Sequence, residues 1–252
     1  MARKEFIFKR KDFAILSGYK KIVKKIETLN LNDFQKINQK LLNNYLLAVI
    51  YKFECICLFM AKLNNLLNEL ATKNKVNSDF RIEYYSAIDF LFFEITSCWD
   101  VLTKINNLIF ELGHEEKKCN FNFIIRTVEK KNKKFIKSRV YYYLTYPERN
   151  PEDKFDILKF MNSFVIDRTF TTHYGMIEAE SIPVRIKKGK TECLSYLPYT
   201  FPENPHHPFK TYPNEKNVRR LFDTAFGVTS FIFDETLKDV YTYLKKKLKT
   251  QK

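Results

Sequence analysis

One stretch of this sequence combines a permanent cation with a residue type that titrates near neutral pH: Arg168-Thr169-Phe170-Thr171-Thr172-His173. To cleave RNA without a metal, an enzyme needs a group that takes the proton from the 2′-hydroxyl or gives one to the leaving 5′-oxygen. A histidine such as His173 can do this. Cleavage also needs a cation for the charge that grows on the phosphate, and the planar guanidinium of Arg168 suits that task.

The spacing of these two residues sets a geometric condition. On one ideal helix, Arg168 and His173 point about 140° apart. Both can therefore reach one phosphate only if the helix ends or bends near Gly175, or if a second subunit completes the site. The alternative interpretation is a satisfied salt bridge and a core histidine, which is the more common use of a lone arginine and a lone histidine in a helix.

The Arg-x4-His pattern resembles the signature of the HEPN superfamily, small all-helical proteins of toxin–antitoxin and anti-phage systems, many of them metal-independent ribonucleases. The resemblance implies a metal-independent endoribonuclease without a cofactor, in which two motif helices meet across a homodimer cleft. It makes Arg168 and His173 the catalytic residues, supported by Thr169 and Tyr174. An antitoxin or a nucleotidyltransferase is a further implied partner. In one toxin subgroup the modified tyrosine lies two places after the histidine, whereas Tyr174 lies one place after. The other expectation is a catalytically inactive HEPN-like module that binds RNA or a partner protein.

Long helices are expected on both sides of the motif segment. All eight prolines fall between Pro147 and Pro213, so uninterrupted helices are allowed elsewhere. A first helix is predicted to start at Asn32, and a second to run from Ser78 to Leu112 with Gly113 as its stop. Their packing stripes, at helical spacing, are Leu42, Leu46, Val49, Phe53, Ile56, Met60, Leu63, Leu67 and Leu70, and then Ile88, Leu91, Ile95, Trp99, Leu102, Ile105 and Ile109.

The motif helix carries a strong start signal, with Asn150 as N-cap and Pro151 at the first helical position. Arg168 continues an apolar line by an i,i+4 step, a costly place for a charge without a purpose or a partner.

Glu94, on the preceding helix, is predicted to be half buried, where it orients Arg168 or His173 or else forms a helix-packing ion pair. Asp100 is expected on a solvated face. The buried lines predicted for the motif helix are Phe155, Leu158, Met161 and Val165, and beside them Ile157, Phe164 and Arg168.

The remaining segments complete the predicted architecture. Residues 120–146 are expected to be helical, although their apolar runs also suit strands. Residues 182–196 predict a two-stranded hairpin, and a Pro-rich loop follows in which His206 and His207 border the substrate cleft. A last helix is predicted to start at the N-cap Asn214, with its stripe at Val218, Leu221, Ala225, Val228, Ile232, Val240 and Leu244. The sequence thus predicts an all-α fold in a single domain, residues 1–252: an antiparallel bundle of long helices with a hairpin and loop insertion, residues 182–213.

The charge of the chain points to a polyanionic partner. A net charge of +15, from 44 Lys and Arg against 29 Asp and Glu, attracts nucleic acid. Lysines cluster at residues 130–139, 187–190 and 245–252, and Lys187, Lys188 and Lys190 are predicted to bind RNA. The alternative is that a Lys- and Asn-rich composition reflects the codon bias of an AT-rich genome, and that the clusters are solvated faces.

Several classes of protein have no support in the sequence. The five cysteines lack zinc-type spacing, so we expect reduced core thiols and no metal site. No charge-free run reaches the length of a membrane-spanning helix and no signal peptide is recognisable, so we expect a cytoplasmic protein. A glycine-rich phosphate loop, a Gly-x-Ser-x-Gly elbow and a His-Glu-x-x-His motif are all missing, which leaves nucleotide hydrolysis, esterase chemistry and zinc proteolysis unsupported.

Overall fold

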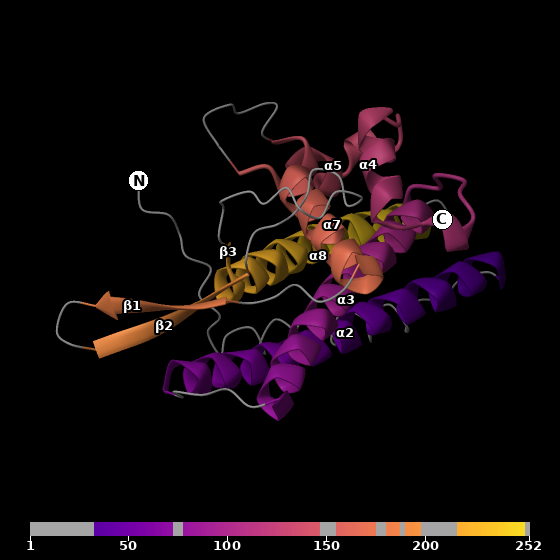
Figure 1. Cartoon of the computed structure of the whole chain (residues 1–252). Coiled ribbons are helices and arrows are strands. Elements are labelled where there is room, and N and C mark those ends of the chain that lie inside the picture. The colour runs from indigo at the N-terminus through magenta and orange to yellow at the C-terminus, as the bar shows by residue number, and fades with distance from the viewer. Residues whose placement is uncertain are drawn as a thin grey trace. The chain divides into compact units, whose positions relative to one another are not determined.

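The computed structural model of this chain describes residues 33–72, 78–146, 155–174, 180–186, 190–197 and 216–249. For some of these, including residues 167–174 and the strands, the backbone alone is described. The described residues are mostly helical, which confirms the all-α class (Figure 1). The elements are α2 (Asp33–Thr72), α3 (Ser78–Ile109), η1 (Glu116–Lys118), α4 (Phe121–Glu129), η2 (Phe135–Lys137), α5 (Arg139–Leu144), α7 (Ile157–Tyr174), β1 (Glu180–Ile186), β2 (Lys190–Leu197), β3 (Lys216–Asn217) and α8 (Val218–Lys249).

The chain divides into two compact units. Unit 1 comprises Met1–Glu54, Ile95–Met161 and Gly227–Lys252, and unit 2 comprises Cys55–Glu94 and Asn162–Phe226. The long helices α2, α3, α7 and α8 each contribute residues to both units. The antiparallel bundle and the single domain stay predictions.

The packing stripe predicted for α3 is confirmed, and that of α2 is confirmed from Leu42 to Leu63. Leu67 is half buried, and the side chain of Leu70 lies outside the described part. Both helices lack proline and glycine, so nothing in their backbone interrupts the hydrogen-bond ladder. In α2, each stripe residue from Leu42 to Leu63 is at most 2% exposed. In α3, each stripe residue is at most 4% exposed. Helix α3 ends at Ile109, three residues before the predicted Leu112, because Glu111 already takes a left-handed conformation with φ 49°. Gly113 follows with φ 79°.

Residues 120–146 are helical, in α4, η2 and α5, and the strand alternative for them is wrong. They form short pieces instead of one helix because capping side chains interrupt them. The side chain of Asn120 accepts the Phe123 N–H at the start of α4, and that of Ser138 accepts the Tyr141 N–H at the start of α5. Asp100 is not simply solvated, because its carboxylate accepts the Phe121 N–H at 3.0 Å and so holds the start of α4.

The core of unit 1 joins α3 to α8. Trp99 is fully buried, and its indole Nε1–H donates to the equally buried Thr229 hydroxyl at 2.8 Å. Phe53 of α2 meets Phe233 of α8 edge to face at 5.3 Å, and Phe121 of α4 meets Trp99 at 5.2 Å. The stripe of α8 is confirmed where its side chains are described: Leu221, Ala225, Val228, Ile232, Val240 and Leu244 are all buried.

The core of unit 2 is aromatic. Phe92 of α3, Phe164 of α7 and Phe222 of α8 are fully buried. Their ring centroids lie 4.8 Å (Phe92 to Phe164), 4.9 Å (Phe92 to Phe222) and 5.9 Å (Phe164 to Phe222) apart, with tilted or edge-to-face geometry that suits aromatic quadrupoles. These three rings fix α7 against α3 and α8 within this unit.

The strands lie in unit 2 between α7 and α8 in the sequence. β1 pairs antiparallel with β2, from Glu180 opposite Tyr196 to Ile186 opposite Lys190. β3 adds a short antiparallel pairing to the end of β2. The loop predicted at residues 198–213 and the N-cap Asn214 lie outside the described residues, and α8 begins at Val218. That this segment is an insertion beside a bundle stays a prediction.

Candidate functional site

The Arg-x4-His motif lies in the last two turns of α7. This helix begins at Ile157, and the carboxylate of Asp156 accepts the Lys159 N–H at 2.9 Å as its N-cap. The predicted start at Asn150 and Pro151 is therefore wrong for this helix, and those residues lie outside the described ones. Helix α7 is described to Tyr174, one residue after His173. Gly175 lies outside the described residues, so the helix end or bend expected there stays a prediction.

The apolar side of α7 is confirmed in part. Met161 and Phe164 are fully buried, whereas Leu158 and Val165 are half buried. Phe155 is 44% exposed, contrary to prediction, because it precedes the helix; its ring centroid lies 5.5 Å from that of Phe160. Arg168 lies one turn beyond the fully buried Phe164. The line that this position continues is half buried at Ile157 and fully buried at Phe164.

The side chains of the motif are outside the described part of the structure. For Arg168, Thr169, His173 and Tyr174 only the helical backbone is described, so their contacts stay predictions. Because Arg168 and His173 both have helical backbone, the divergence of about 140° expected for this spacing applies to them. Positions 168 and 173 therefore lie on different sides of the helix axis.

The structure describes some of the residues that were predicted to support catalysis or to bind RNA, but not all of them. Glu94 of α3 is 8% exposed, so it is more deeply buried than predicted. Like the motif it belongs to unit 2, but its proposed role toward Arg168 or His173 stays a prediction. Lys190 is the first residue of β2, opposite Ile186, and its side chain is not described. Lys187, Lys188 and the loop histidines His206 and His207 lie outside the described residues.

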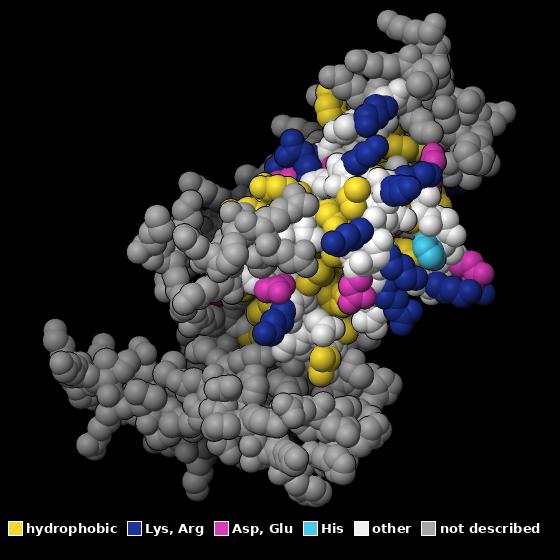
Figure 2. Space-filling view, turned by 90° about the horizontal axis from the view of Figure 1, so that it is seen from above, with side chains coloured by type: hydrophobic (Ala, Val, Ile, Leu, Met, Phe, Trp, Pro, Cys, Tyr) yellow, Lys and Arg dark blue, Asp and Glu magenta, His cyan; other side chains and the backbone are white. Residues whose placement is uncertain are grey.

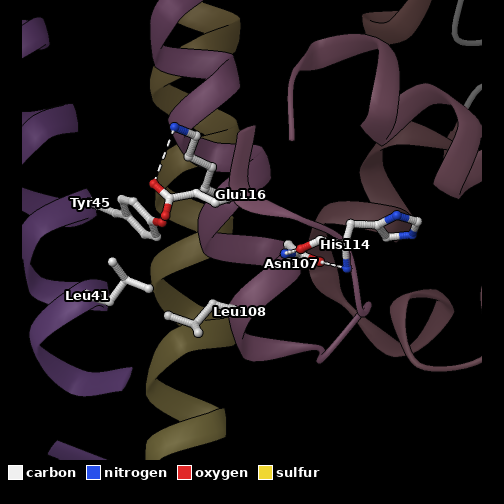
Figure 3. A pocket seen from close by; sticks show the side chains of 7 residues that line it. Leu41, Tyr45, Asn107, Leu108, His114 and Glu116 are labelled. Carbon is white, nitrogen blue, oxygen red and sulfur yellow. Dashed lines mark hydrogen bonds and ion pairs between the residues drawn. The ribbon is translucent and has the colours of Figure 1, made fainter. Parts of the chain in front are cut away.

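A pocket of about 210 Å³ in unit 1 was not foreseen from the sequence. Figure 3 shows the Tyr45 hydroxyl of α2 beside the Glu116 carboxylate of η1, with a dashed line marking the ion pair of Glu116. The Glu116 carboxylate lies 3.7 Å from Lys104 Nζ, and this ammonium lies 6.0 Å from the centre of the Tyr45 ring. The pocket is lined by Leu41, Tyr45, Lys104, Asn107, Leu108, His114 and Glu116.

Two groups at this pocket, the Tyr45 hydroxyl and the nearby Cys119 thiol, have a raised pKa. Burial raises the pKa of the Tyr45 hydroxyl well above its usual range, and the hydrogen bond to Glu116 and its negative charge raise it further. Burial also raises the pKa of the nearby Cys119 thiol, against the pull of Lys104. Neither group is therefore a ready nucleophile. The volume is below the roughly 300 Å³ of the smallest ordinary ligand pockets. We read the cluster as a structural link between α2, α3 and η1.

His114 does not belong to the chemistry of this pocket. Figure 3 shows its imidazole turned away from Tyr45 and Glu116. Asn107 holds only its backbone, donating to the His114 carbonyl at 2.9 Å and accepting the His114 N–H at 3.3 Å. The ring instead lies against Phe123 of α4, with centroids 4.2 Å apart. The local spacing of the sequence carries no signal for these pairs, since Tyr45 and Glu116 are far apart in the chain.

Positive charge is concentrated on the surface that follows α3. Between Glu111 and Arg139 the sequence has nine basic and four acidic residues, and all nine basic side chains are exposed. Figure 2 shows dark blue Lys and Arg side chains gathered on one face, with a histidine beside them. Glu111 pairs with Lys134 at 3.2 Å, and Glu115 pairs with Lys118 at 3.2 Å. Such exposed pairs are weak, so the face stays positive.

The remaining expectations concern metals, thiols and membranes. Among the described residues, no group of three or more His, Cys, Asp or Glu side chains is arranged to hold a metal ion. Cys57, Cys98 and Cys119 are buried free thiols and Cys55 is a half-buried one, as predicted. None of the helices in the described ranges has the apolar length that a membrane crossing requires.

Comparison with known proteins gives no relative for this chain. No protein-family model, no curated protein and no solved structure matches it.

Proposed function

We propose that this chain is a metal-independent endoribonuclease of the HEPN type that acts in a toxin or anti-phage defence context in the cytoplasm. The observation that carries the proposal is the Arg-x4-His motif in the last two described turns of helix α7. The mostly helical described fold and the net charge of +15 are consistent with an RNA-directed helical protein.

The proposed reaction uses both motif residues. The 2′-oxygen of the RNA attacks the adjacent phosphorus, so that the O2′–P bond forms and the P–O5′ bond breaks. One His173 imidazole takes the 2′-hydroxyl proton or supplies a proton to the leaving 5′-oxygen. The Arg168 guanidinium stabilises the charge on the non-bridging phosphate oxygens. Thr169, Tyr174 and Glu94 are proposed to support the orientation of these groups, and no cofactor is needed.

The proposed active unit is a homodimer. Because Arg168 and His173 diverge on their own helix, one subunit offers an incomplete site, and a two-fold axis would bring two arginines and two histidines into one cleft. The long helices are proposed to form an antiparallel bundle, and residues 182–213 an insertion that borders this cleft. Within it, the hairpin lysines (Lys187, Lys188 and Lys190) are proposed to bind RNA. An antitoxin or a nucleotidyltransferase is the proposed regulatory partner.

The test compares motif variants with a matched control. In EDTA, wild type and Arg219→Ala are expected to cleave a mixed RNA pool, because Arg219 is an exposed arginine of α8 that pairs with Asp223 at 3.8 Å. Arg168→Ala and His173→Ala are expected to lose cleavage by at least about a hundredfold, as for the removal of an acid–base or charge-stabilising group. Mixing these two inactive variants is expected to restore part of the activity, since each supplies what the other lacks. Motif variants that cleave as well as Arg219→Ala would refute the proposal.

A second candidate function is a catalytically inactive HEPN-like module that binds RNA or a partner protein. The exposed basic side chains between Glu111 and Arg139 favour it, because they offer a binding surface without acid–base chemistry. This module would bind RNA with an affinity that falls steeply with salt and does not depend on His173. Binding without cleavage in any RNA pool would select it over the nuclease.

A further inference from the structure

The basic surface after α4 is built on a fixed backbone. Five of the eight residues from Lys130 to Lys137, which we call the lysine turn, are lysines, and all five are exposed. Phe135 anchors the turn, because its side chain is fully buried and its ring lies 5.6 Å from that of Phe110 and 5.9 Å from that of Tyr141.

The backbone of the turn is also held by hydrogen bonds. The Asn132 side chain accepts the N–H groups of Lys134 at 3.0 Å and Phe135 at 3.3 Å, and Lys131 takes a left-handed conformation with φ 47°. The Lys131 N–H donates to the Val128 carbonyl of α4 at 2.9 Å. The lysines therefore start from defined positions, so a polyanion that binds them loses little backbone entropy of the protein.

Helix α4 extends this surface with a different chemistry. Its apolar side, with Phe121, Ile124 and Val128, is buried. Phe123 and Arg126, three residues apart, and Lys130, four further on, share the outward side. The exposed His114 ring lies against the half-buried Phe123 ring at 4.2 Å and an interplanar angle of 60°. The outward side of α4 thus has an aromatic pair, His114 and Phe123, at one end and the cation Lys130 at the other.

We propose that this face of α4 and the lysine turn form a binding site for single-stranded RNA. Arg126, Lys130 and the other lysines of the turn contact phosphates, and an unpaired base stacks on the His114–Phe123 pair. Aromatic side chains beside a cationic track are the recurring solution for single strands, since every base has a π-face. From Phe123 to Lys130 the helix rises about 10 Å, the length of about three stacked nucleotides. The inference rests on RNA as the ligand of the proposed function and concerns binding alone.

A membrane surface fits this face less well than RNA. A helix that lies on a bilayer must turn its apolar side to the lipid, but the apolar side of α4 is already in the protein core. Duplex RNA also fits less well, because its bases are paired and stacked on each other and cannot stack on His114 and Phe123. The observations therefore favour an unpaired strand.

The first arm of the test measures charge. Binding of a labelled single-stranded RNA 12-mer to the full chain is followed by fluorescence anisotropy, in a His173→Ala background so that cleavage does not consume the probe. Arg126→Glu with Lys130→Glu is expected to weaken binding at least about tenfold. The matched control, Lys40→Glu with Lys62→Glu on α2, makes the same change in net charge at exposed positions and is expected to cost less than about threefold.

The second arm measures stacking. His114→Ala with Phe123→Leu is expected to weaken single-strand binding at least about fivefold and to leave binding of a duplex RNA unchanged. Phe155→Leu, at an exposed phenylalanine before α7, is the control and should change neither. Circular dichroism of each variant checks that the helical content is retained, and Phe123→Tyr, which keeps an aromatic ring, is expected to preserve binding.

Each outcome separates this inference from the nuclease proposal. Equal losses in the α4 and α2 charge variants, or equal losses of single-strand and duplex binding in the stacking variant, would overturn the RNA site. Binding to phosphatidylserine vesicles with the same dependence on Arg126 and Lys130 would overturn it in favour of a membrane. Conversely, RNA binding that depends on this face in a protein that cleaves no RNA supports the site and refutes the nuclease.

Discussion

The hydrogen bond between Trp99 and Thr229 provides a sharp test of the core of unit 1. Both side chains are fully buried, and the indole Nε1–H donates to the hydroxyl at 2.8 Å. Thr229→Val keeps the shape of the side chain but removes the acceptor, so a buried donor loses its partner. We expect the free energy of unfolding to fall by about 1–3 kcal/mol, the cost of an unsatisfied buried polar group.

Urea unfolding followed by circular dichroism and by the fluorescence of Trp99, the only tryptophan of the chain, measures this change. Thr242→Val is the matched control on the same helix, because Thr242 is exposed and its hydroxyl donates only to the Lys238 carbonyl. It should cost less than about 0.5 kcal/mol. Trp99→Phe should cost less in the Thr229→Val background than in wild type, since the hydrogen bond is already gone. Equal effects of the two valine variants would refute the reasoning.

Three further predictions follow from other parts of the chain. Phe135→Ala, at the buried anchor of the lysine turn, should lower the free energy of unfolding by about 3–5 kcal/mol in urea titrations. Phe155→Ala, at an exposed phenylalanine, should lower it by less than about 1 kcal/mol. Similar losses in the two variants would contradict the role of Phe135 as a buried anchor. Burial raises the pKa of Asp239 above its ordinary value of 3.8, so folding favours the protonated form of this carboxyl group. As the pH rises from about 4 through the raised pKa, wild type should therefore lose stability relative to Asp239→Asn. Parallel curves of the urea midpoint against pH for the two proteins would contradict this. Charge reversal of the hairpin lysines should weaken RNA binding in anisotropy titrations without lowering the urea midpoint, and an unchanged affinity would place the hairpin away from the RNA.

Periodicity explains why the long helices were predictable. In α2 and α3 an apolar residue recurs every three or four positions, and burial of that stripe fixes which side of the helix faces the core. The ends of helices depend on single side chains, and there the sequence offered competing signals. Asn150 with Pro151 is a good start signal, yet Asp156 caps α7 through the Lys159 N–H.

Long-range polar contacts explain most of what the sequence did not predict. Asp100 lies on the polar side of α3 by its periodicity, but its carboxylate caps α4 twenty-one residues later in the chain. Tyr45 of α2 and Glu116 of η1 line the same pocket although they are far apart in the sequence. No local spacing encodes such contacts, because they depend on the tertiary arrangement.

For the candidate site, the sequence predicted that the motif lies on a helix, and Arg168 and His173 both have helical backbone in α7. Convergence of Arg168 and His173 on one phosphate depends on side-chain rotamers, on the chain after Gly175 and on a second subunit. Spacing within one sequence specifies none of these.

Cleavage of RNA in EDTA is the measurement that tests the central claim most directly. Incubation of end-labelled RNA with the full chain should yield fragments that end in a 2′,3′-cyclic phosphate, because attack by the 2′-oxygen needs no metal and no water. The His173→Ala variant should yield none above background. Intact RNA with wild type in every RNA pool, or the same fragments with His173→Ala, would contradict a nuclease that uses this motif.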